Sequence, residues 1–191
     1  IIMAILYPNL ETIINAKVKP EPGELQLLKF LIANLNDTFE VFFNPMLNGD
    51  RPDIVILRKG FGVLIIEVKD YNLNSYELDQ RKNWVVKHNK ARIKSPISQA
   101  LKYKENLFHL HIPQLLEKQI NNYRVLNVVN CALYFHNANS DAINELLVSP
   151  FEHDANYLKF LKYNIKFLGR DNLNEFDFEE FLRAIKRSEE R

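Results

Sequence analysis

The sequence predicts a single α/β domain whose mixed central sheet is flanked by helices. Two β-branched runs joined by a glycine-containing turn predict an antiparallel hairpin in the first half of the chain. Helical and extended patterns alternate in the second half, which is typical of crossovers between parallel strands. The 191 residues, 47% of them hydrophobic, are enough to bury one core.

The first predicted helix covers residues 24–35. Pro22 and Gly23 stand just before it, and proline is well tolerated where a helix begins. Leucine and isoleucine then recur at the three- and four-residue spacing of one helix face. These apolar positions are Leu27, Leu28, Leu31, Ile32 and Leu35.

Three strands are predicted after this helix, because aromatic and β-branched residues fill short runs between turn residues. The first run, 39–43, ends at an Asn-Pro turn. The second and third runs, 53–57 and 63–68, are separated by a turn with two glycines at 59–62, so we expect them to pair as a hairpin.

Further elements are predicted in the second half of the chain. A helix should start at Ser95-Pro96, since an apolar stripe with helical spacing follows (Ile97, Ala100, Leu101, Leu107 and Leu110). The other predicted elements are a hairpin of 84–87 with 90–93, a long strand at 125–135, a short helix at 140–147, a short strand at 165–168 and an amphipathic helix at 177–187.

The expected organisation is a main domain over residues 23–175, with an N-terminal extension (1–22) before it and a C-terminal helix (176–191) after it. The last residues are polar, so we expect this helix to lead into a further domain. The apolar N-terminus lacks a basic leader and a small-residue cleavage site, so it does not resemble a signal peptide. No apolar run reaches the ~18 residues of a membrane span, and we expect no membrane partner.

Cysteine usage points to the cellular compartment. Cys131 is the single cysteine, and one thiol can form neither an internal disulfide nor a zinc site by itself. We therefore expect a reducing, cytoplasmic setting. Cys131 lies in a predicted buried strand without a partner base, so we expect its thiol to be inert.

Basic residues gather between positions 80 and 104, although the net charge is only +1. No acidic residue occurs in this segment. Such a segment either supplies phosphate contacts to DNA or forms an ordinary solvated surface, and the sequence leaves both open. Its basic residues are Arg81, Lys82, Lys87, Lys90, Arg92, Lys94, Lys102 and Lys104.

Three charged residues stand out at one end of the predicted hairpin of 53–57 and 63–68. Glu67 and Lys69 are two positions apart at the end of an apolar strand, so their side chains point to the same face. Asp53 begins the partner strand, and the hairpin should bring it beside Glu67. Charged groups in such a run are costly unless they are paired or bind an ion. The pattern predicts a carboxylate site for Mg²⁺ or Mn²⁺ with a lysine beside it, although a surface ion pair would explain Glu67 and Lys69 alone.

At these residues the sequence resembles the nuclease-related domain (NERD) family, a branch of the PD-(D/E)XK nuclease superfamily with the restriction-endonuclease-like fold. The resemblance runs from about Gly23 to Leu107, with the motifs in the family's order. A further resemblance, in the strand at 133–135 and in 165–173, is to versions fused ahead of a superfamily 1 helicase. The main motifs are Gly23-Glu24, Arg51-Pro52-Asp53, Glu67-Val68-Lys69-Asp70-Tyr71 and Ser95-Pro96 with Gln99 and Tyr103.

The resemblance implies a role for each residue of the predicted hairpin site. Asp53 and Glu67 would bind the divalent metal together with the backbone carbonyl of Val68. Lys69 would be the catalytic lysine. The resemblance thus assigns the metal and the lysine to the same residues that the charge pattern singles out.

The resemblance also implies roles for residues of the two long helices. Glu24 would be an additional ligand of the metal or of its water, whereas a helix dipole alone would equally favour an acidic residue there. Gln99 and Tyr103 are four positions apart and share one helix face. They would support the site and contact DNA; the alternative is that Tyr103 packs and Gln99 caps a backbone group.

Other candidate sites have less support. His109 and His111 are two positions apart and lack a paired Cys or His at zinc-ligand spacing. Trp84 lies among basic residues and either stacks on a base or anchors the core. Glycine is too sparse for a Walker A or dinucleotide loop, so we do not expect the chain to hydrolyse ATP.

Together, the residues and the resemblance predict a Mg²⁺- or Mn²⁺-dependent deoxyribonuclease that hydrolyses DNA phosphodiester bonds with little base specificity. The alternative is a catalytically weak DNA-binding or docking module of a larger helicase or defence protein. The expected partners are DNA and a fused or associated helicase. The sequence does not distinguish endonuclease from exonuclease or DNA from RNA.

Overall fold

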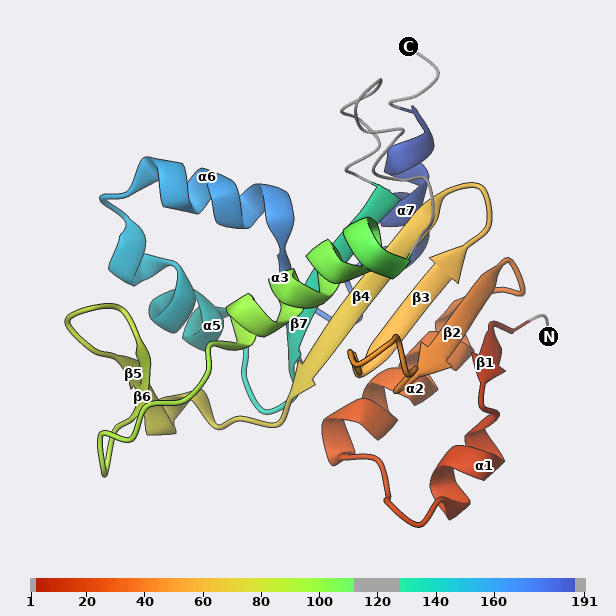
Figure 1. Cartoon of the computed structure of the whole chain (residues 1–191), viewed down its shortest axis with the longest axis horizontal. Helices are drawn as coiled ribbons and strands as arrows, with labels where there is room; N and C mark the ends of the chain where they lie inside the picture. The colour runs from red at the N-terminus through yellow and green to blue at the C-terminus, as the bar shows by residue number, and fades with distance from the viewer. Residues whose placement is uncertain (1–2, 112–127, 188–191) are drawn as a thin grey trace.

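A computed structural model describes residues 3–111 and 128–187 of the chain. Within these residues, a six-stranded mixed sheet is flanked by helices (Figure 1). This confirms the α/β fold class and the sheet type expected from the sequence. The strands of this sheet are β1 (Ile5–Tyr7), β2 (Phe39–Phe43), β3 (Ile54–Arg58), β4 (Gly62–Lys69), β7 (Val129–Phe135) and β8 (Lys166–Gly169).

The strands lie in the order β1-β2-β3-β4-β7-β8. β2, β3 and β4 form an antiparallel meander, which confirms the predicted hairpin of β3 with β4. Parallel pairs join β1 to β2, β4 to β7 and β7 to β8. The predicted bounds of β2 are correct, and those of β3, β4 and β8 differ by one residue at each end. The strand predicted at 125–135 corresponds to β7, and its first residues, 125–127, lie outside the described residues.

The helices predicted at 24–35, from Ser95-Pro96, at 140–147 and at 177–187 are all present, with starts within about two residues of those expected. None of the helices in the described part of the chain is long and apolar enough to cross a membrane. The α-helices are α1 (Leu10–Asn15), α2 (Pro22–Asn34), α3 (Pro96–Asn106), α5 (Ser140–Leu147), α6 (Ala155–Asn164) and α7 (Phe178–Arg187). Short 3₁₀ helices, η1 (Leu73–Ser75) and η4 (Ser149–Phe151), and a π-helical segment, η2 (Leu107–His111), are also present.

The hairpin predicted for 84–87 and 90–93 is formed only in part. The first run forms β6 (Trp84–Val86), but its strand partner is β5 (Tyr76–Leu78), in a separate two-stranded sheet that projects from the main body (Figure 1). Residues 90–93 contribute an isolated bridge between Val85 and Arg92. β5 has three residues with a glutamate in the middle, which is too short for a recognisable strand pattern.

Besides β5 and the short helical turns, three elements occur where the sequence analysis predicted none: β1, α1 and α6. β1 adds a parallel edge strand beside β2, so residues 5–7 take part in the main sheet. β1 is too short for its pattern to stand out. α6 leads into β8 and exposes two aromatic residues, Phe160 and Tyr163, which blurs the apolar face that would identify a helix.

Two apolar cores lie on opposite faces of the sheet, because successive side chains of a strand alternate between faces. Along β4, Leu64 and Ile66 belong to the core that also contains residues of α2 and α7. Ile65 belongs to the core that also contains residues of α3, α5 and α6. Glu67 follows Ile65 by two positions and therefore points toward α3. This register places a carboxylate between the sheet and a helix.

Candidate active site

The hairpin of β3 and β4 brings Asp53 next to Glu67. Ile54 pairs with Ile66, so Asp53, one position before β3, falls opposite Glu67. The Oδ2 atom of Asp53 accepts a hydrogen bond of 2.7 Å from the backbone N–H of Val68. The local geometry of one hairpin therefore holds both carboxylates at the same end of the sheet.

Glu67 is buried, with 1% of its surface exposed. Its Oε1 atom accepts hydrogen bonds from Lys69 Nζ at 2.6 Å and from Gln99 Nε2 at 2.5 Å. Its Oε2 atom is also buried but has no hydrogen-bond partner among the described residues. A buried oxygen without a partner is costly, and it is the kind of atom that a bound cation would satisfy.

Burial makes both carboxyl groups weaker acids, and at Glu67 the charge of Asp53 adds to the effect of burial. Burial, followed by the charge of Asp53, raises the pKa of Glu67 to about 7 against the opposing attraction of Lys69. Burial also raises the pKa of Asp53, although the hydrogen bond from Val68 opposes this effect. Without a cation, the pair therefore resists full ionisation near neutral pH.

Lys69 lies between the carboxylates and an aromatic ring. Burial by itself would lower the pKa of the Lys69 amine, but the nearby charges of Glu67 and Asp53 outweigh burial and raise it. The amine also lies 5.9 Å from the ring centroid of Tyr71. Lys69 is therefore a cation at neutral pH, fixed beside both carboxylates.

Helix α3 connects to the site through Gln99. Its Nε2 atom, besides donating to Glu67, lies 3.4 Å from the hydroxyl oxygen of Tyr103. α3 packs on β4 and β7, because Ile97 and Ala100 are buried in the core on this face. The side-chain amide of Gln99 thus donates to the carboxylate of Glu67, whereas the alternative expected it to cap a backbone group.

Glu24 lies in the first turn of α2. Its Oε2 atom accepts a hydrogen bond of 2.8 Å from the backbone N–H of Glu21, which caps the helix. Burial raises the pKa of Glu24, and the charge of Asp53 adds to this effect. The structure shows the capping role, whereas the role of Glu24 toward a metal or its water stays a prediction.

Asp70 is a residue of this region that the sequence analysis did not assign to the site. Its Oδ2 atom accepts a hydrogen bond of 3.1 Å from the backbone N–H of Gly23, and its Oδ1 atom is buried without a hydrogen-bond partner among the described residues. A Cβ atom at Gly23 would overlap Asp70 Oδ1 and lie 2.8 Å from His136 Cβ. The start of α2 and the end of β4 therefore meet as closely as a glycine allows. One sign in the sequence that Asp70 belongs to this region is that Gly23 and Asp70 both lie in the motifs that carry the family resemblance.

A cavity of about 340 Å³ opens where α2 meets the end of β4. Acidic side chains and the amine of Lys69 line it, so it combines anionic ligands with one cation. Its size suits a hydrated ion and a phosphate group better than a large apolar ligand. The lining residues are Glu21, Glu24, Asp53, Val68, Lys69, Asp70 and Tyr71.

The donor set fits a hard divalent cation. Asp53 and the unpartnered oxygen of Glu67 provide carboxylate oxygens, the ligands that Mg²⁺ prefers in proteins. Across residues 3–111 and 128–187, no group of three or more His, Cys, Asp or Glu residues could hold a metal ion. The other ligands would then be water and a backbone carbonyl such as that predicted at Val68, which agrees with the tendency of Mg²⁺ to keep several waters.

The basic segment of 80–104 is mostly exposed, but carboxylates from outside the segment neutralise part of its charge. Residues 80–104 include no acidic residue, but folding brings acidic residues from flanking and distant positions beside this segment. The ion pairs are Lys90 with Glu77, Arg92 with Asp79 at 3.5 Å and Lys102 with Asp50 at 3.3 Å. DNA binding by this segment stays a prediction.

Trp84 is a core residue. It is 3% exposed and packs against the ring of Tyr76, with the centroids 6.1 Å apart. The core interpretation is confirmed, and stacking on a base is wrong for this residue because its faces are covered.

The side chain of His109 is exposed just after α3, and that of His111 lies outside the described part of the chain.

Cys131 is buried in β7, and its thiol donates a hydrogen bond of 3.1 Å to the backbone oxygen of Asn164. Burial raises the pKa of the thiol to about 12. Because the thiolate is the reactive form, the folded protein should not react with a chromogenic disulfide reagent at mildly alkaline pH. The same reagent should titrate one thiol per chain as soon as the protein is unfolded in urea. Rapid reaction of the native protein would contradict this expectation.

A comparison with known protein families finds a family model that matches this chain. The family model described as nuclease-related domain (NERD) matches residues 19–136. The match is more than half of the chain and contains every site residue discussed above, from Glu24 to Tyr103. The six-stranded mixed sheet flanked by helices is consistent with a restriction-endonuclease-like fold. No curated protein and no solved structure matches the chain.

Proposed function

Because the chain belongs to the nuclease-related domain (NERD) family, we propose that it hydrolyses phosphodiester bonds of DNA with Mg²⁺ or Mn²⁺ as its cofactor. The observation that carries this proposal is the meeting of Asp53, Glu67 and Lys69 at one end of a hairpin, with an unpartnered oxygen on Glu67. Two carboxylates and a lysine in this arrangement suit phosphodiester hydrolysis with a divalent cation.

Asp53 and Glu67 hold the cation in this proposal, together with the backbone carbonyl of Val68. When bound, the cation supplies Lewis acidity and lowers the pKa of water. Gln99 donates its hydrogen bond to one oxygen of Glu67 and so orients the other oxygen as a ligand. Gln99 is neutral, and it fixes this carboxylate without competing for the ion.

Lys69 acts on the substrate side of the same carboxylates. Its amine keeps its proton, since the charges of Glu67 and Asp53 raise its pKa. A fixed ammonium orients the attacking water or neutralises the charge that develops on the phosphoryl oxygens. Glu24 lines the same cavity and would be an additional ligand of the metal or of its water.

DNA binds through its phosphates in this proposal, so base specificity is low. The exposed basic residues of 80–104 supply phosphate contacts. Those whose side chains have no ion pair or hydrogen bond among the described residues contribute most, because the others must first give up a partner. These residues are Arg81, Lys87 and Lys94.

The test compares DNA cleavage by the native chain and by Lys69→Ala. Plasmid and single-stranded DNA are incubated with Mg²⁺ or Mn²⁺, and the products are followed on gels. We expect cleavage by the native chain and a loss of about 100-fold in Lys69→Ala, since a fixed charge in a site of this kind contributes that much to the rate. Lys59→Ala, which removes an exposed lysine in the β3–β4 turn, is the matched control and should cleave normally. Equal activity of the native chain and Lys69→Ala would end the proposal.

A second function, a DNA-binding or docking module of a larger helicase or defence protein, keeps the fold without turnover. The observation that favours it is the ion pair of Lys69 with Glu67 at 2.6 Å, which balances the charge of this carboxylate without a metal. Calorimetric titration with Mn²⁺ separates the two functions. Binding that is lost in Glu67→Ala supports the enzyme, whereas salt-sensitive DNA binding without metal binding supports the module.

A further inference from the structure

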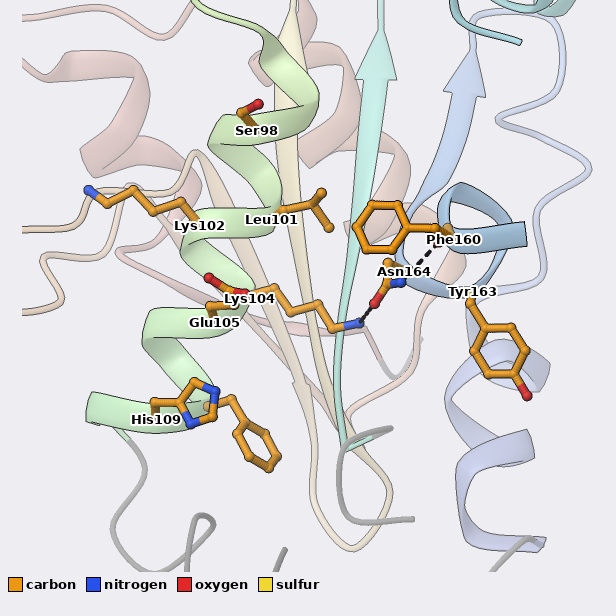
Figure 2. A pocket seen from close by; sticks show the side chains of 10 residues that line it. Ser98, Leu101, Lys102, Lys104, Glu105, His109, Phe160, Tyr163 and Asn164 are labelled. Atoms are coloured by element: carbon orange, nitrogen blue, oxygen red, sulfur yellow. Dashed lines mark hydrogen bonds between the residues drawn. The ribbon is translucent and has the colours of Figure 1, made fainter. Parts of the chain in front are cut away.

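A second cavity, of about 600 Å³, lies between α3 and α6, and Figure 2 shows the side chains around it. It is larger than the cavity at the carboxylates and has a different chemistry, because aromatic and aliphatic side chains form much of its wall. The amine of Lys104 extends from α3 toward α6 across it (Figure 2). The residues that matter here are Leu101, Lys104, Phe108, Phe160, Tyr163 and Asn164.

Lys104 is a half-buried cation at this cavity, which Glu105 also lines. Its Nζ atom donates a hydrogen bond of 3.4 Å to the side-chain oxygen of Asn164, and no carboxylate of the described residues forms a salt bridge with it. Burial lowers the pKa of its amine, and Cys131 and Glu105 oppose this effect without overcoming it. An amine in this position is available to an anionic group or a carbonyl oxygen that enters the cavity.

Two exposed aromatic side chains of α6 stand at this cavity. Phe160 is 46% exposed and Tyr163 is 74% exposed. The ring of Phe160 is supported by Tyr157, whose ring is stacked on it with the centroids 6.3 Å apart. Exposed aromatic rings beside a cavity commonly serve as contact surfaces for planar ligands.

The cavity and the carboxylate site lie on opposite flanks of α3. Gln99 and Tyr103 face the site. Leu101 lies two positions after Gln99, and Glu105 lies two positions after Tyr103. Two positions correspond to a rotation of about 200° around a helix, so Leu101 and Glu105 point to the other flank. Lys102 lies between the two flanks, on the exposed side of α3, and its side chain is half-exposed despite its ion pair with Asp50. A helix is about 10 to 12 Å across, which a few nucleotides of a single strand can span.

We infer that this cavity binds an unpaired nucleotide of the substrate strand, with its base against the aromatic side chains of α6. This inference rests on the proposed function and specifies its substrate class as DNA with a single-stranded segment. The aromatic wall suits the π-face of any base, and Lys104 suits a phosphate or a base carbonyl oxygen. The strand passes from the carboxylates over Lys102 and into the cavity. A base within a duplex would be stacked and paired, so it could not enter.

The experiment measures binding in the presence of EDTA, so that it does not depend on cleavage. Fluorescence anisotropy is recorded with a labelled single-stranded oligonucleotide and with an abasic oligonucleotide of the same length and charge. We expect the native chain to bind the strand with bases about tenfold more tightly than the abasic strand. Tyr163→Ala should lose most of this difference. Its high exposure means that the substitution leaves the fold intact.

Matched variants separate the ring from other effects. Tyr163→Phe keeps the aromatic face and should retain the preference for bases. Lys104→Met should weaken binding of both strands, whereas Lys159→Met, which removes an exposed lysine of α6 outside the cavity, should change neither. Unchanged base preference in Tyr163→Ala, or equal affinity of the native chain for both strands, would overturn the inference.

The binding and cleavage measurements test the nucleotide site and the proposed function independently. If the native chain prefers the strand with bases but cleaves no DNA with Mg²⁺ or Mn²⁺, the proposed function is wrong and the nucleotide site stands. If the chain cleaves DNA but Tyr163→Ala binds and cleaves single strands as the native chain does, the nucleotide site is wrong and the proposed function stands.

Discussion

Replacing Glu67 with glutamine is expected to reduce DNA cleavage by about 1000-fold or more while making the protein more stable. Glutamine keeps the shape of the side chain and one acceptor oxygen, but it replaces the other oxygen with an amide nitrogen and so removes the anionic ligand. A cation in such a site contributes several kcal/mol to transition-state stabilisation, and each ~1.4 kcal/mol corresponds to a factor of ten in rate. Cleavage of plasmid DNA with Mn²⁺ measures the first effect. Activity within about tenfold of the native chain would show that Glu67 holds no essential ion.

The gain in stability follows from the pKa of Glu67. The pKa is about 7 in the folded protein, above the ordinary value of 4.5, so the folded state holds the proton more tightly than the unfolded state does. The free energy of unfolding of the metal-free protein should therefore fall as the pH rises from about 4.5 to about 7, by on the order of 3 kcal/mol, and then level off. Glu67→Gln cannot ionise and should lack most of this fall.

Urea denaturation at several pH values, in the presence of EDTA, measures this difference. Glu40→Gln is the matched control, because it removes a carboxylate from β2, away from the site, and should keep the pH dependence of the native chain. At a pH about one unit above the pKa of Glu67, we expect Glu67→Gln to be more stable than the native chain. A variant that is less stable there would mean that the ion pair with Lys69 contributes more than the burial of the charge costs.

The second large effect is expected at Gly23. In an ordinary helix, replacing glycine with alanine stabilises the protein by up to about 1 kcal/mol. At Gly23 the added methyl group would overlap Asp70 and lie 2.8 Å from His136 Cβ and 3.0 Å from Val68 Cγ1. We therefore expect Gly23→Ala to lower the free energy of unfolding by about 2 to 3 kcal/mol, as overpacking does. Equilibrium urea unfolding measures the change.

The same substitution should reduce DNA cleavage by about tenfold or more, because α2 must move away from the end of β4. That movement would displace Glu24 and weaken the hydrogen bond from Gly23 to Asp70. Gln26→Ala, at an exposed position of the same helix, is the control and should change stability by no more than about 0.5 kcal/mol. A Gly23→Ala protein as stable as the native chain would show that the contact relaxes freely.

The meeting of Asp53 with Glu67 could be predicted from the sequence because it depends on local rules. The β-branched runs and the glycine turn define one hairpin, and the two-residue period of a strand puts Glu67 and Lys69 on one face. The position of Gln99 was available only through the family resemblance. Nothing in residues 95–103 shows that their helix packs on β4 with Gln99 over Glu67, 32 positions earlier in the chain.

The charge of the basic segment shows the limit of a sequence window. Lys102 pairs with Asp50, which is 52 positions away. Lys90 and Arg92 pair with residues in and just after β5, a strand too short to be recognised. A count of charges along the chain therefore overstated the free positive charge of the folded segment, since ion pairing depends on which surfaces folding brings together.

The sequence by itself determined the fold class, the central hairpin, the long helices and the three charged residues of the site, because periodicity and turn chemistry act between near neighbours. Only the tertiary structure decided the contact of Gln99 with Glu67, the close approach of Gly23 to Asp70, the partner of β6 and the cavity between α3 and α6. Those features depend on how the helices pack on the sheet. Packing is set by the summed burial of many distant side chains, which no short stretch of sequence contains.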